Sequence, residues 1–199
     1  MSVIATITMS VDGFVTGPED GPTYGLGIGG ERLHYWVMGG PWTYGDEHDP
    51  TATTGTDKAF LDDVVAGMGA AVCGRGMYEA VGAWGGENPF EGTLFVLTHR
   101  TDDAPAPSTG FVFVDDLDVA MEQAAAAAAG RDVGIGGGAD VIRQALTAGY
   151  VDELAISTAP VVLGRGKRLF DGFEQDIDLE IQRVYTSPFA THVRYAIKP

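Results

Sequence analysis

The chain alternates between short apolar runs and segments in which apolar residues recur every three or four positions. The apolar runs, rich in β-branched residues, predict strands at 3–9, 70–73, 94–98, 111–114, 133–135, 151–157, 179–186 and 191–197. The helical spacing predicts helices at 57–66, 115–129 and 139–147, and a further helix that begins near Met77. Ser187-Pro188 separates the last two strands and favours a hairpin at that point.

This order of elements predicts the fold class. Strands that alternate with helices are typical of a parallel sheet covered on both faces, whereas the final two strands have no helix between them. We therefore expect a three-layer α/β/α architecture with a mostly parallel central sheet and an antiparallel C-terminal edge. The 199 residues, 45% of them hydrophobic, suit one domain over residues 1–199 and indicate neither disorder nor a membrane span.

Residues 17–56 follow neither pattern and are heavy in glycine and proline, with one possible short helix at 31–38. A long irregular segment inside a compact domain is usually a lid or a binding loop. Its aromatic side chains would suit stacking on a heteroaromatic substrate, and Trp36 and Trp42 could instead anchor the loop to the body. The aromatic and histidine residues of this segment are Tyr24, His34, Tyr35, Trp36, Trp42, Tyr44 and His48.

The charge balance narrows the range of partners. Twelve basic and 28 acidic residues give a formal net charge of −16, which would repel a nucleic-acid backbone or an anionic membrane. Any anionic ligand must therefore be held by a few local cations and by backbone amides. The basic cluster Arg165, Lys167 and Arg168 could touch a substrate phosphate, although a solvated turn explains it more simply.

Three further features concern the cellular location, the cysteine and metal binding. Met1–Ser10 has neither a basic segment nor a cleavage site of small residues, so we expect a cytoplasmic protein. The lone Cys73 excludes an internal disulfide, and its apolar neighbours indicate a buried strand residue. No metal site is expected, because His34 and His48 lack clean ligand spacing with the nearby Asp46, Glu47 and Asp49.

Three predicted strand ends carry ligand-like residues, and ligands of open α/β sheets collect at the carboxyl ends of strands. Gly136-Gly137-Gly138 precedes a helix, where backbone amides can approach a pyrophosphate and Asp140 could cap the helix or meet a ribose hydroxyl. Gly74-Arg75 and Thr98-His99-Arg100 follow two other strands and could bind phosphate groups. Together the three turns predict a dinucleotide site, and the extra pair of cations favours NADP over NAD.

Each turn also has a plainer interpretation. The three glycines could form an ordinary tight turn, and Arg75 could be a surface arginine paired with a carboxylate such as Glu79. Thr98-His99-Arg100 could be a solvated strand end. Asp12, our candidate for a polar group near the reacting centre, could equally be a turn residue of the Asp12-Gly13 pair.

These motifs resemble those of a known family. Six of them occur in order along the chain: Ser10-Val-Asp12-Gly13-Phe-Val15, Gly74-Arg75-x-x-Tyr78-Glu79, Val96-Leu-Thr98-His99-Arg100, Ile135-Gly-Gly-Gly-Ala-Asp140, Val151-Asp152-Glu153-Leu154, and Pro160 to Phe170. The pattern resembles the dihydrofolate-reductase-like superfamily over essentially the whole chain. More narrowly, it resembles the C-terminal reductase domain of the bacterial bifunctional riboflavin-biosynthesis deaminase-reductase and its stand-alone relatives.

The resemblance implies a fold, a homodimer and a set of site residues. It implies that NADPH contacts Thr8, Val15, Gly74, Arg75, Thr98, His99, Arg100, Gly136, Gly137, Gly138, Ala139 and Asp140. It also implies that the first strand and the loop after it line the substrate, through Ser10, Asp12 and Gly13, and we add Trp36 from the predicted lid.

The chain departs from the family pattern in two places. Met77 stands where dihydrofolate reductases have a hydroxyl-bearing residue two places after the arginine. Asp57 matches their substrate-binding carboxylate only with a shift of one residue, so we weigh a catalytic role for it against capping of the predicted helix at 57–66. The upstream deaminase domain is also missing from this sequence, so a role in riboflavin synthesis does not follow.

From these observations we predict an NADPH-dependent oxidoreductase that transfers hydride to a C=N or C=O bond of a small heterocycle, pterin-like or riboflavin-precursor-like. The candidates for catalysis are Asp12 and Asp57. Two alternatives stay open: an NADP-binding protein without turnover, acting as a sensor or scaffold, and an authentic dihydrofolate reductase.

Overall fold

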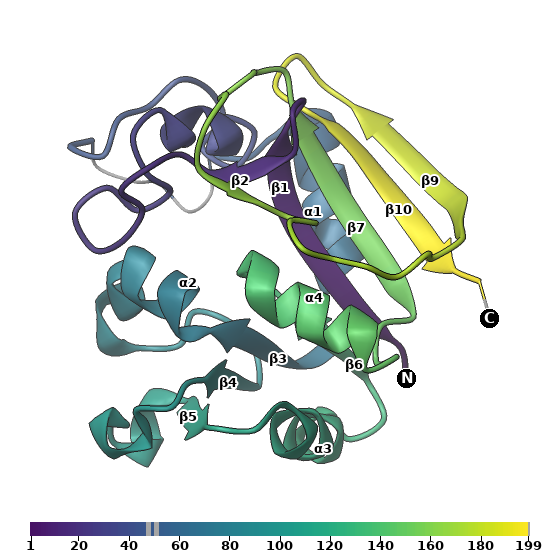
Figure 1. Ribbon diagram of the computed structural model, residues 1–199. Coiled ribbons are helices and arrows are strands. Elements are labelled where there is room, and N and C mark those ends of the chain that lie inside the picture. The colour runs from purple at the N-terminus through teal and green to yellow at the C-terminus, as the bar shows by residue number, and fades with distance from the viewer. Residues whose placement is uncertain (47–48, 50–51, 199) are drawn as a thin grey trace.

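The computed structural model describes residues 1–46, 49 and 52–198. Its main sheet has eight strands in the order β5-β4-β3-β6-β1-β7-β10-β9 (Figure 1). Six of these strands, β5, β4, β3, β6, β1 and β7, pair in parallel with their neighbours. Strand β10 runs antiparallel to β7, and β9 runs antiparallel to β10. Their bounds are β1 Val3–Ser10, β3 Met68–Gly74, β4 Thr93–Leu97, β5 Phe111–Val114, β6 Asp132–Ile135, β7 Glu153–Ala159, β9 Leu179–Thr186 and β10 Thr191–Ile197.

Helices cover both faces of this sheet. The helices are α1 Gly55–Val65, α2 Arg75–Ala80, α3 Leu117–Ala128 and α4 Ala139–Thr147. On one face α3 and α4 pack against alternate residues of the strands, such as Val72, Val133 and Leu154. On the other face α1 packs against Ile4 and Ala155. The expected three-layer architecture with its antiparallel C-terminal edge is therefore confirmed.

Several boundaries differ from the predicted ones. The helix predicted at 115–129 begins at Leu117, because the Asp116 side chain accepts a hydrogen bond from the Val119 amide at 3.0 Å and caps it. The short helix predicted at 31–38 is the 3-10 helix Gly30–His34. Two short strands were not predicted at all, β2 Phe14–Thr16 and β8 Lys167–Arg168, which pair antiparallel with each other.

The pairing of β2 with β8 bears on the interpretation of the basic cluster. Arg168 lies over the ring of Phe14, with its guanidinium carbon 4.5 Å from the ring centroid. Lys167 forms an ion pair with Asp20 at 2.6 Å. All three cations are exposed, as expected of a solvated turn, and two of them also connect this segment to β2 and to the loop after it.

The capping role that we weighed for Asp57 is wrong. Helix α1 begins two residues earlier, at Gly55, and its N-cap residue is Thr54. Asp57 therefore lies inside the first turn, with 5% of its surface exposed, and its carboxylate bonds to a side chain of another element. Three-dimensional packing rather than helix capping accounts for its position.

Candidate functional site

The glycine turns after β3 and β6 lie against each other. The Gly74 amide donates a hydrogen bond to the Gly137 carbonyl at 2.8 Å, and the Gly136 amide donates to Val72 at 3.0 Å. Helix α4 follows directly, with Gly138 as its N-cap and no side chain capping its first turn. The amides of that turn are therefore left for a ligand or for water.

The space around these glycines distinguishes their roles. A Cβ atom at Gly74 would lie 3.0 Å from Cγ2 of Val141, so a side chain there would crowd the turn against α4. A Cβ atom at Gly138 would meet no atom within 4 Å, so this residue borders open space. The space beside Gly138, at the start of α4, is therefore open to a ligand or to a side chain, and we call it the cradle.

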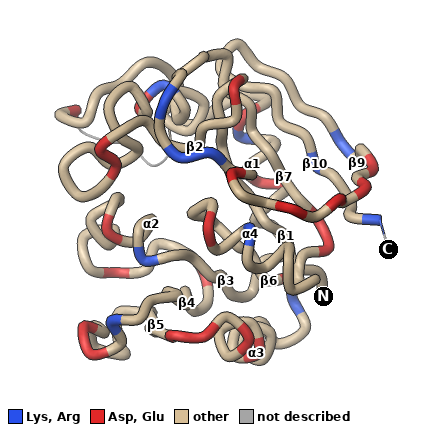
Figure 2. The backbone as a smooth tube through the Cα atoms, viewed as in Figure 1, with Lys and Arg blue, Asp and Glu red and all other residues tan. Residues whose placement is uncertain are grey.

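The turns after β3 and β4 are joined by charged side chains. Glu79 Oε1 accepts hydrogen bonds from Arg75 Nε at 2.9 Å and from Arg100 at 2.5 Å. Asp103, in the 3-10 helix Thr101–Asp103, contacts Arg75 at 3.2 Å and Arg100 at 3.9 Å. We call these four residues the charge ring. Figure 2 shows basic segments beside acidic ones at these strand ends.

Arg75 is the most enclosed cation of the charge ring. Its side chain is 19% exposed and its guanidinium carbon lies 5.0 Å from the Phe113 ring centroid and 5.6 Å from that of Tyr78. One of its terminal nitrogens, Nη1, is buried and has no hydrogen-bond partner among the described residues. Because a buried N–H group normally has an acceptor, this nitrogen is suited to a ligand oxygen.

The other predicted cofactor residues around these turns differ in exposure. Thr98 is buried and its hydroxyl accepts a hydrogen bond from the Arg100 amide at 3.1 Å, whereas His99 is exposed. Ala139, the first residue of α4, is buried. Asp140 is exposed and bonds to Arg143 and Gln144 of the same helix, so it does not cap α4.

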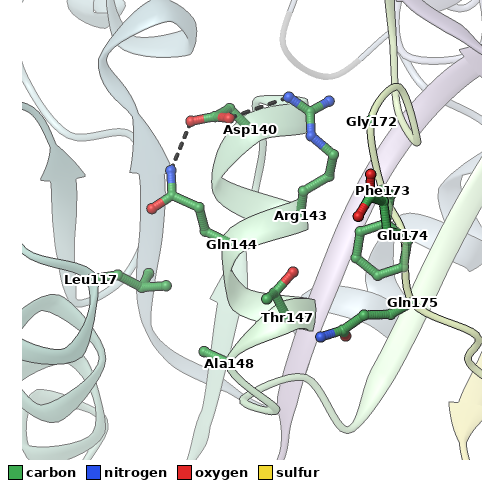
Figure 3. Close-up of a pocket in the computed structure, with 10 residues that line it drawn as sticks. All are labelled: Leu117, Asp140, Arg143, Gln144, Thr147, Ala148, Gly172, Phe173, Glu174 and Gln175. Carbon is green, nitrogen blue, oxygen red and sulfur yellow. Dashed lines mark hydrogen bonds and ion pairs between the residues drawn. The ribbon is translucent and has the colours of Figure 1, made fainter.

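A shallow groove of about 780 Å³ runs between α4 and residues 172–175 (Figure 3). Asp140 is the predicted site residue that lines it, and the ion pair of Asp140 with Arg143 is drawn at its upper end. Arg143 also donates to the carbonyl groups of Arg168 and Leu169, both at 3.1 Å. These contacts hold the neighbouring loop, so we assign the groove no ligand.

Asp12 ties two loops together at the end of β1. Its carboxylate accepts hydrogen bonds from the Ser10 hydroxyl at 2.6 Å and from the amides of Leu163 and Gly164 at 3.0 and 2.8 Å. The Ser10 hydroxyl also accepts from the Phe14 amide at 2.9 Å. The Ser10 bond, more than any other cause, lowers the pKa of Asp12 to about 2. Asp12 is therefore ionised at neutral pH, and it lies in the turn between β1 and β2, as the alternative interpretation expects.

The remaining predicted residues of this region support the same turn or pack in the interior. Gly13 has a φ of 83°, a conformation that favours glycine, in the bend between β1 and β2. Val15 is buried in the main core. Thr8 is buried on β1 and accepts a hydrogen bond from Nε1 of Trp36 at 3.1 Å.

Trp36 holds the irregular segment against the sheet. It is 6% exposed and packs edge-on against Phe60 and His192, at centroid distances of 5.7 and 4.8 Å. This is the anchoring role that we left open. His34, on the same segment, has its pKa lowered to about 4 by burial. Glu47 and His48, part of the metal-like group considered above, lie outside the described residues.

A buried polar chain connects α1, β10 and β7. His192 Nε2 bonds to Oδ1 of Asp57 at 2.8 Å, and His192 Nδ1 bonds to the Ser157 hydroxyl at 2.7 Å. His192 also stacks on Phe60, with centroids 4.2 Å apart. Burial lowers the pKa of His192, although Asp57 opposes that shift, so the imidazole is neutral at neutral pH.

The strand register places the buried hydrogen bond between Ser157 and His192 level with Thr8 of β1. Thr8 pairs with Ser157 on β7, and Ser157 pairs with His192 on β10, so the three residues form a row across the sheet. Sequence reasoning missed both Ser157 and His192. The one available signal was a polar residue within each apolar strand run, which does not identify a partner.

The described residues give no sign of a metal centre or a membrane span. No group of three or more metal-ligating side chains gathers in residues 1–46, 49 and 52–198. Over the same residues, no helix is long and apolar enough to cross a membrane. Cys73 is buried, and burial raises the pKa of its thiol to about 12, so it is not a nucleophile at neutral pH.

The sheet order defines an α/β protein, and similarity to solved structures shows that its fold is dihydrofolate-reductase-like. The family model of the RibD C-terminal domain matches residues 1–193 of the sequence, and the chain belongs to that family. This confirms the resemblance read from the motifs and makes the protein a member of a reductase-like family.

Comparison with known proteins gives one curated relative and several similar folds. The uncharacterized protein YyaP of Bacillus subtilis (strain 168) is 42% identical over 64 residues, which are 32% of this chain and a third (33%) of YyaP. The crystal structure of a putative riboflavin biosynthesis protein from Shewanella sp. PV-4 is similar over 100% of both chains, with a TM-score of 0.73 and 20% identity.

Two further structures share the fold. A pyrimidine reductase-like protein from Corynebacterium diphtheriae has a TM-score of 0.65 and 15% identity, covering 100% of this chain and 92% of its own. Dihydrofolate reductase from Enterococcus faecalis, complexed with NADP(H) and RAB-propyl, has a TM-score of 0.59 and 18% identity, covering 100% and 97%. At these identities the likeness establishes the fold.

Proposed function

We propose that the protein is an NADPH-dependent reductase of a small heterocycle, pterin-like or riboflavin-precursor-like. The observation that carries this proposal is the buried, unpartnered Nη1 of Arg75, on a turn that is hydrogen-bonded through Gly74 to the glycine turn with the open cradle at Gly138. A phosphate oxygen would accept a hydrogen bond from Nη1 of Arg75, and a pyrophosphate would fit the cradle at Gly138. Membership of a reductase-like family and the fold shared with a protein complexed with NADP(H) support the same proposal.

The residues of the three turns would hold the cofactor. Arg75 and Arg100 would bind the ribose 2′-phosphate, with Thr98 and His99 beside them, and residues 136–140 would hold the pyrophosphate at the start of α4. Thr8 would border the nicotinamide, because Ala5 pairs with Ile135 and so brings β1 beside the glycine turn. Val15 would join it from β2, which follows β1 after a short bend. When bound, NADPH supplies the hydride.

Asp57 is our candidate for contact with the substrate. Its bond to His192 uses Oδ1, which leaves Oδ2 for an N–H group of a heterocycle. Asp12 would not supply a proton at neutral pH, since its pKa is about 2, so its part is to hold the loops around the substrate with Ser10 and Gly13. Trp36 would then act by fixing the irregular segment over the site.

Binding and turnover test the proposal separately. NADPH is titrated by fluorescence or calorimetry, with NADH as the control. If NADPH shows no saturable binding up to the millimolar range, the proposal is wrong. Oxidation of NADPH in the presence of dihydrofolate and other pterin, flavin-precursor and pyrimidine compounds then separates the alternatives. Binding without any oxidation would favour a sensor, and oxidation with dihydrofolate alone would favour an authentic dihydrofolate reductase.

Filling the cradle gives a direct test of the pyrophosphate site. We expect Gly138→Ala to weaken NADPH binding about tenfold, because its methyl group enters the space left for the ligand. Gly45→Ala is the matched control, since a Cβ atom at Gly45 also meets no atom within 4 Å but lies in an exposed turn. Affinity is measured by calorimetry, and folding by circular dichroism. Equal affinities in the two folded variants would contradict the cradle assignment.

We also propose a homodimer. The outermost strand β9 presents apolar side chains to solvent, with Leu179, Ile181 and Val184 37%, 63% and 50% exposed. An exposed apolar edge strand is commonly covered by another chain. Size-exclusion chromatography with light scattering should give twice the 20.9 kDa mass of the chain, and the mass of one chain at micromolar concentration would contradict this.

A further inference from the structure

The charge ring holds as many carboxylates as cations. Two guanidinium groups, Arg75 and Arg100, face two carboxylates, Glu79 and Asp103, so the ring carries no net charge of its own. A site that must attract a 2′-phosphate by charge is therefore already neutralised before the nucleotide arrives.

The two carboxylates are held differently. Glu79 lies four residues after Arg75 on α2, its side chain is 34% exposed, and it bonds to both cations at 2.9 and 2.5 Å. Asp103 comes from a separate turn, its side chain is 51% exposed, and its contacts are longer, at 3.2 and 3.9 Å. Asp103 is thus the weaker and more replaceable partner of the two arginines.

We propose that Asp103 determines the selectivity between NADPH and NADH by occupying the two guanidinium groups that the ribose 2′-phosphate would use. The 2′-phosphate must displace this carboxylate or bind beside it, and either event lowers the affinity that the two arginines would otherwise give. Glu79 remains in place and keeps the arginines oriented. NADH lacks the phosphate, so its affinity does not depend on Asp103. This inference rests on the proposed function, because it concerns the same nucleotide site.

The test compares neutralisation of two adjacent aspartates. Asp103→Asn removes the competing charge and keeps the shape of the side chain. Asp102→Asn removes the same charge one residue away in the same exposed turn, at a side chain outside the charge ring. NADPH and NADH are each titrated by calorimetry into the wild-type protein and both variants at fixed ionic strength. Asp103→Ala serves as a second variant, and circular dichroism checks the folding of all three.

We expect Asp103→Asn to raise the affinity for NADPH about fivefold, the effect typical of an exposed ion pair, with NADH changed less than twofold. Asp102→Asn should change both affinities less than twofold. Equal changes in the two variants, an equal gain for NADH, or a weaker NADPH complex in both Asp103 variants would overturn the inference while leaving the reductase proposal standing. If the wild-type protein binds neither nucleotide, the proposed function itself is overturned, and this inference with it.

Discussion

Replacing Arg75 by alanine is expected to lower the affinity for NADPH about 100-fold, with a smaller loss for NADH. Arg75 is the most enclosed cation at the predicted phosphate site, and truncation of one partner of such a charge pair commonly costs about 2–5 kcal/mol. The variant also leaves Glu79 and Asp103 facing the phosphate with only Arg100 to balance them. Calorimetric titration of both nucleotides measures the effect.

Two control variants separate this local role from charge in general. Arg131→Ala removes a cation at the opposite end of the strands, just before β6, where its guanidinium lies 3.9 Å from the exposed Glu91. We expect a change below twofold there. Arg75→Lys keeps the charge but loses the planar fork and the stacking on Phe113, so about a tenfold loss is expected. Equal losses in Arg75→Ala and Arg131→Ala would show that the site lies elsewhere.

The largest effect on stability is expected for His192→Leu, which should lower the free energy of unfolding by about 3–5 kcal/mol. The substitution removes the hydrogen-bond partner of two buried groups, Asp57 and Ser157, and leaves the Asp57 carboxylate without that partner in the interior. Urea unfolding followed by circular dichroism measures the change. His99→Leu makes the same replacement at an exposed histidine and should change stability by about 0.5 kcal/mol or less.

A double variant tests whether the unpaired carboxylate causes the loss. Asp57→Leu combined with His192→Leu should be more stable than His192→Leu alone, because it removes both members of the buried pair. If the double variant lost the sum of the two single effects, the contact between these side chains would contribute nothing to folding.

The same histidine makes stability depend on pH. Burial holds the pKa of His192 below its ordinary value of 6.5 and that of His34 at about 4, so the native state binds fewer protons than the unfolded chain between those values. The free energy of unfolding should therefore fall as pH decreases from about 6.5 towards 4. In the double variant without Asp57 and His192, the part due to His192 should be missing and the decrease should be smaller, and an unchanged pH profile would refute the assignment.

Local patterns were sufficient to locate the turns of the candidate site. The carboxyl ends of parallel strands share one edge of a sheet, so Gly74-Arg75 and the glycines at 136–138 were expected together, and their hydrogen bond shows them together. Whether these residues bind NADPH remains a prediction. The pattern also placed Asp57 on the correct helix, but the start of α1 at Gly55 displaced it from the capping position.

The sequence by itself determined the alternation of strands and helices, the antiparallel edge and the family, because periodicity and short motifs are local properties of the chain. Only the tertiary structure decided which side chains meet. His192 lies 135 residues from Asp57, and Asp103 lies 28 residues from Arg75, yet each pair is in contact. Such pairings follow from the order and register of the strands, which bring residues distant in sequence close together in space. Buried polar groups then form hydrogen bonds with the polar neighbours that packing places beside them.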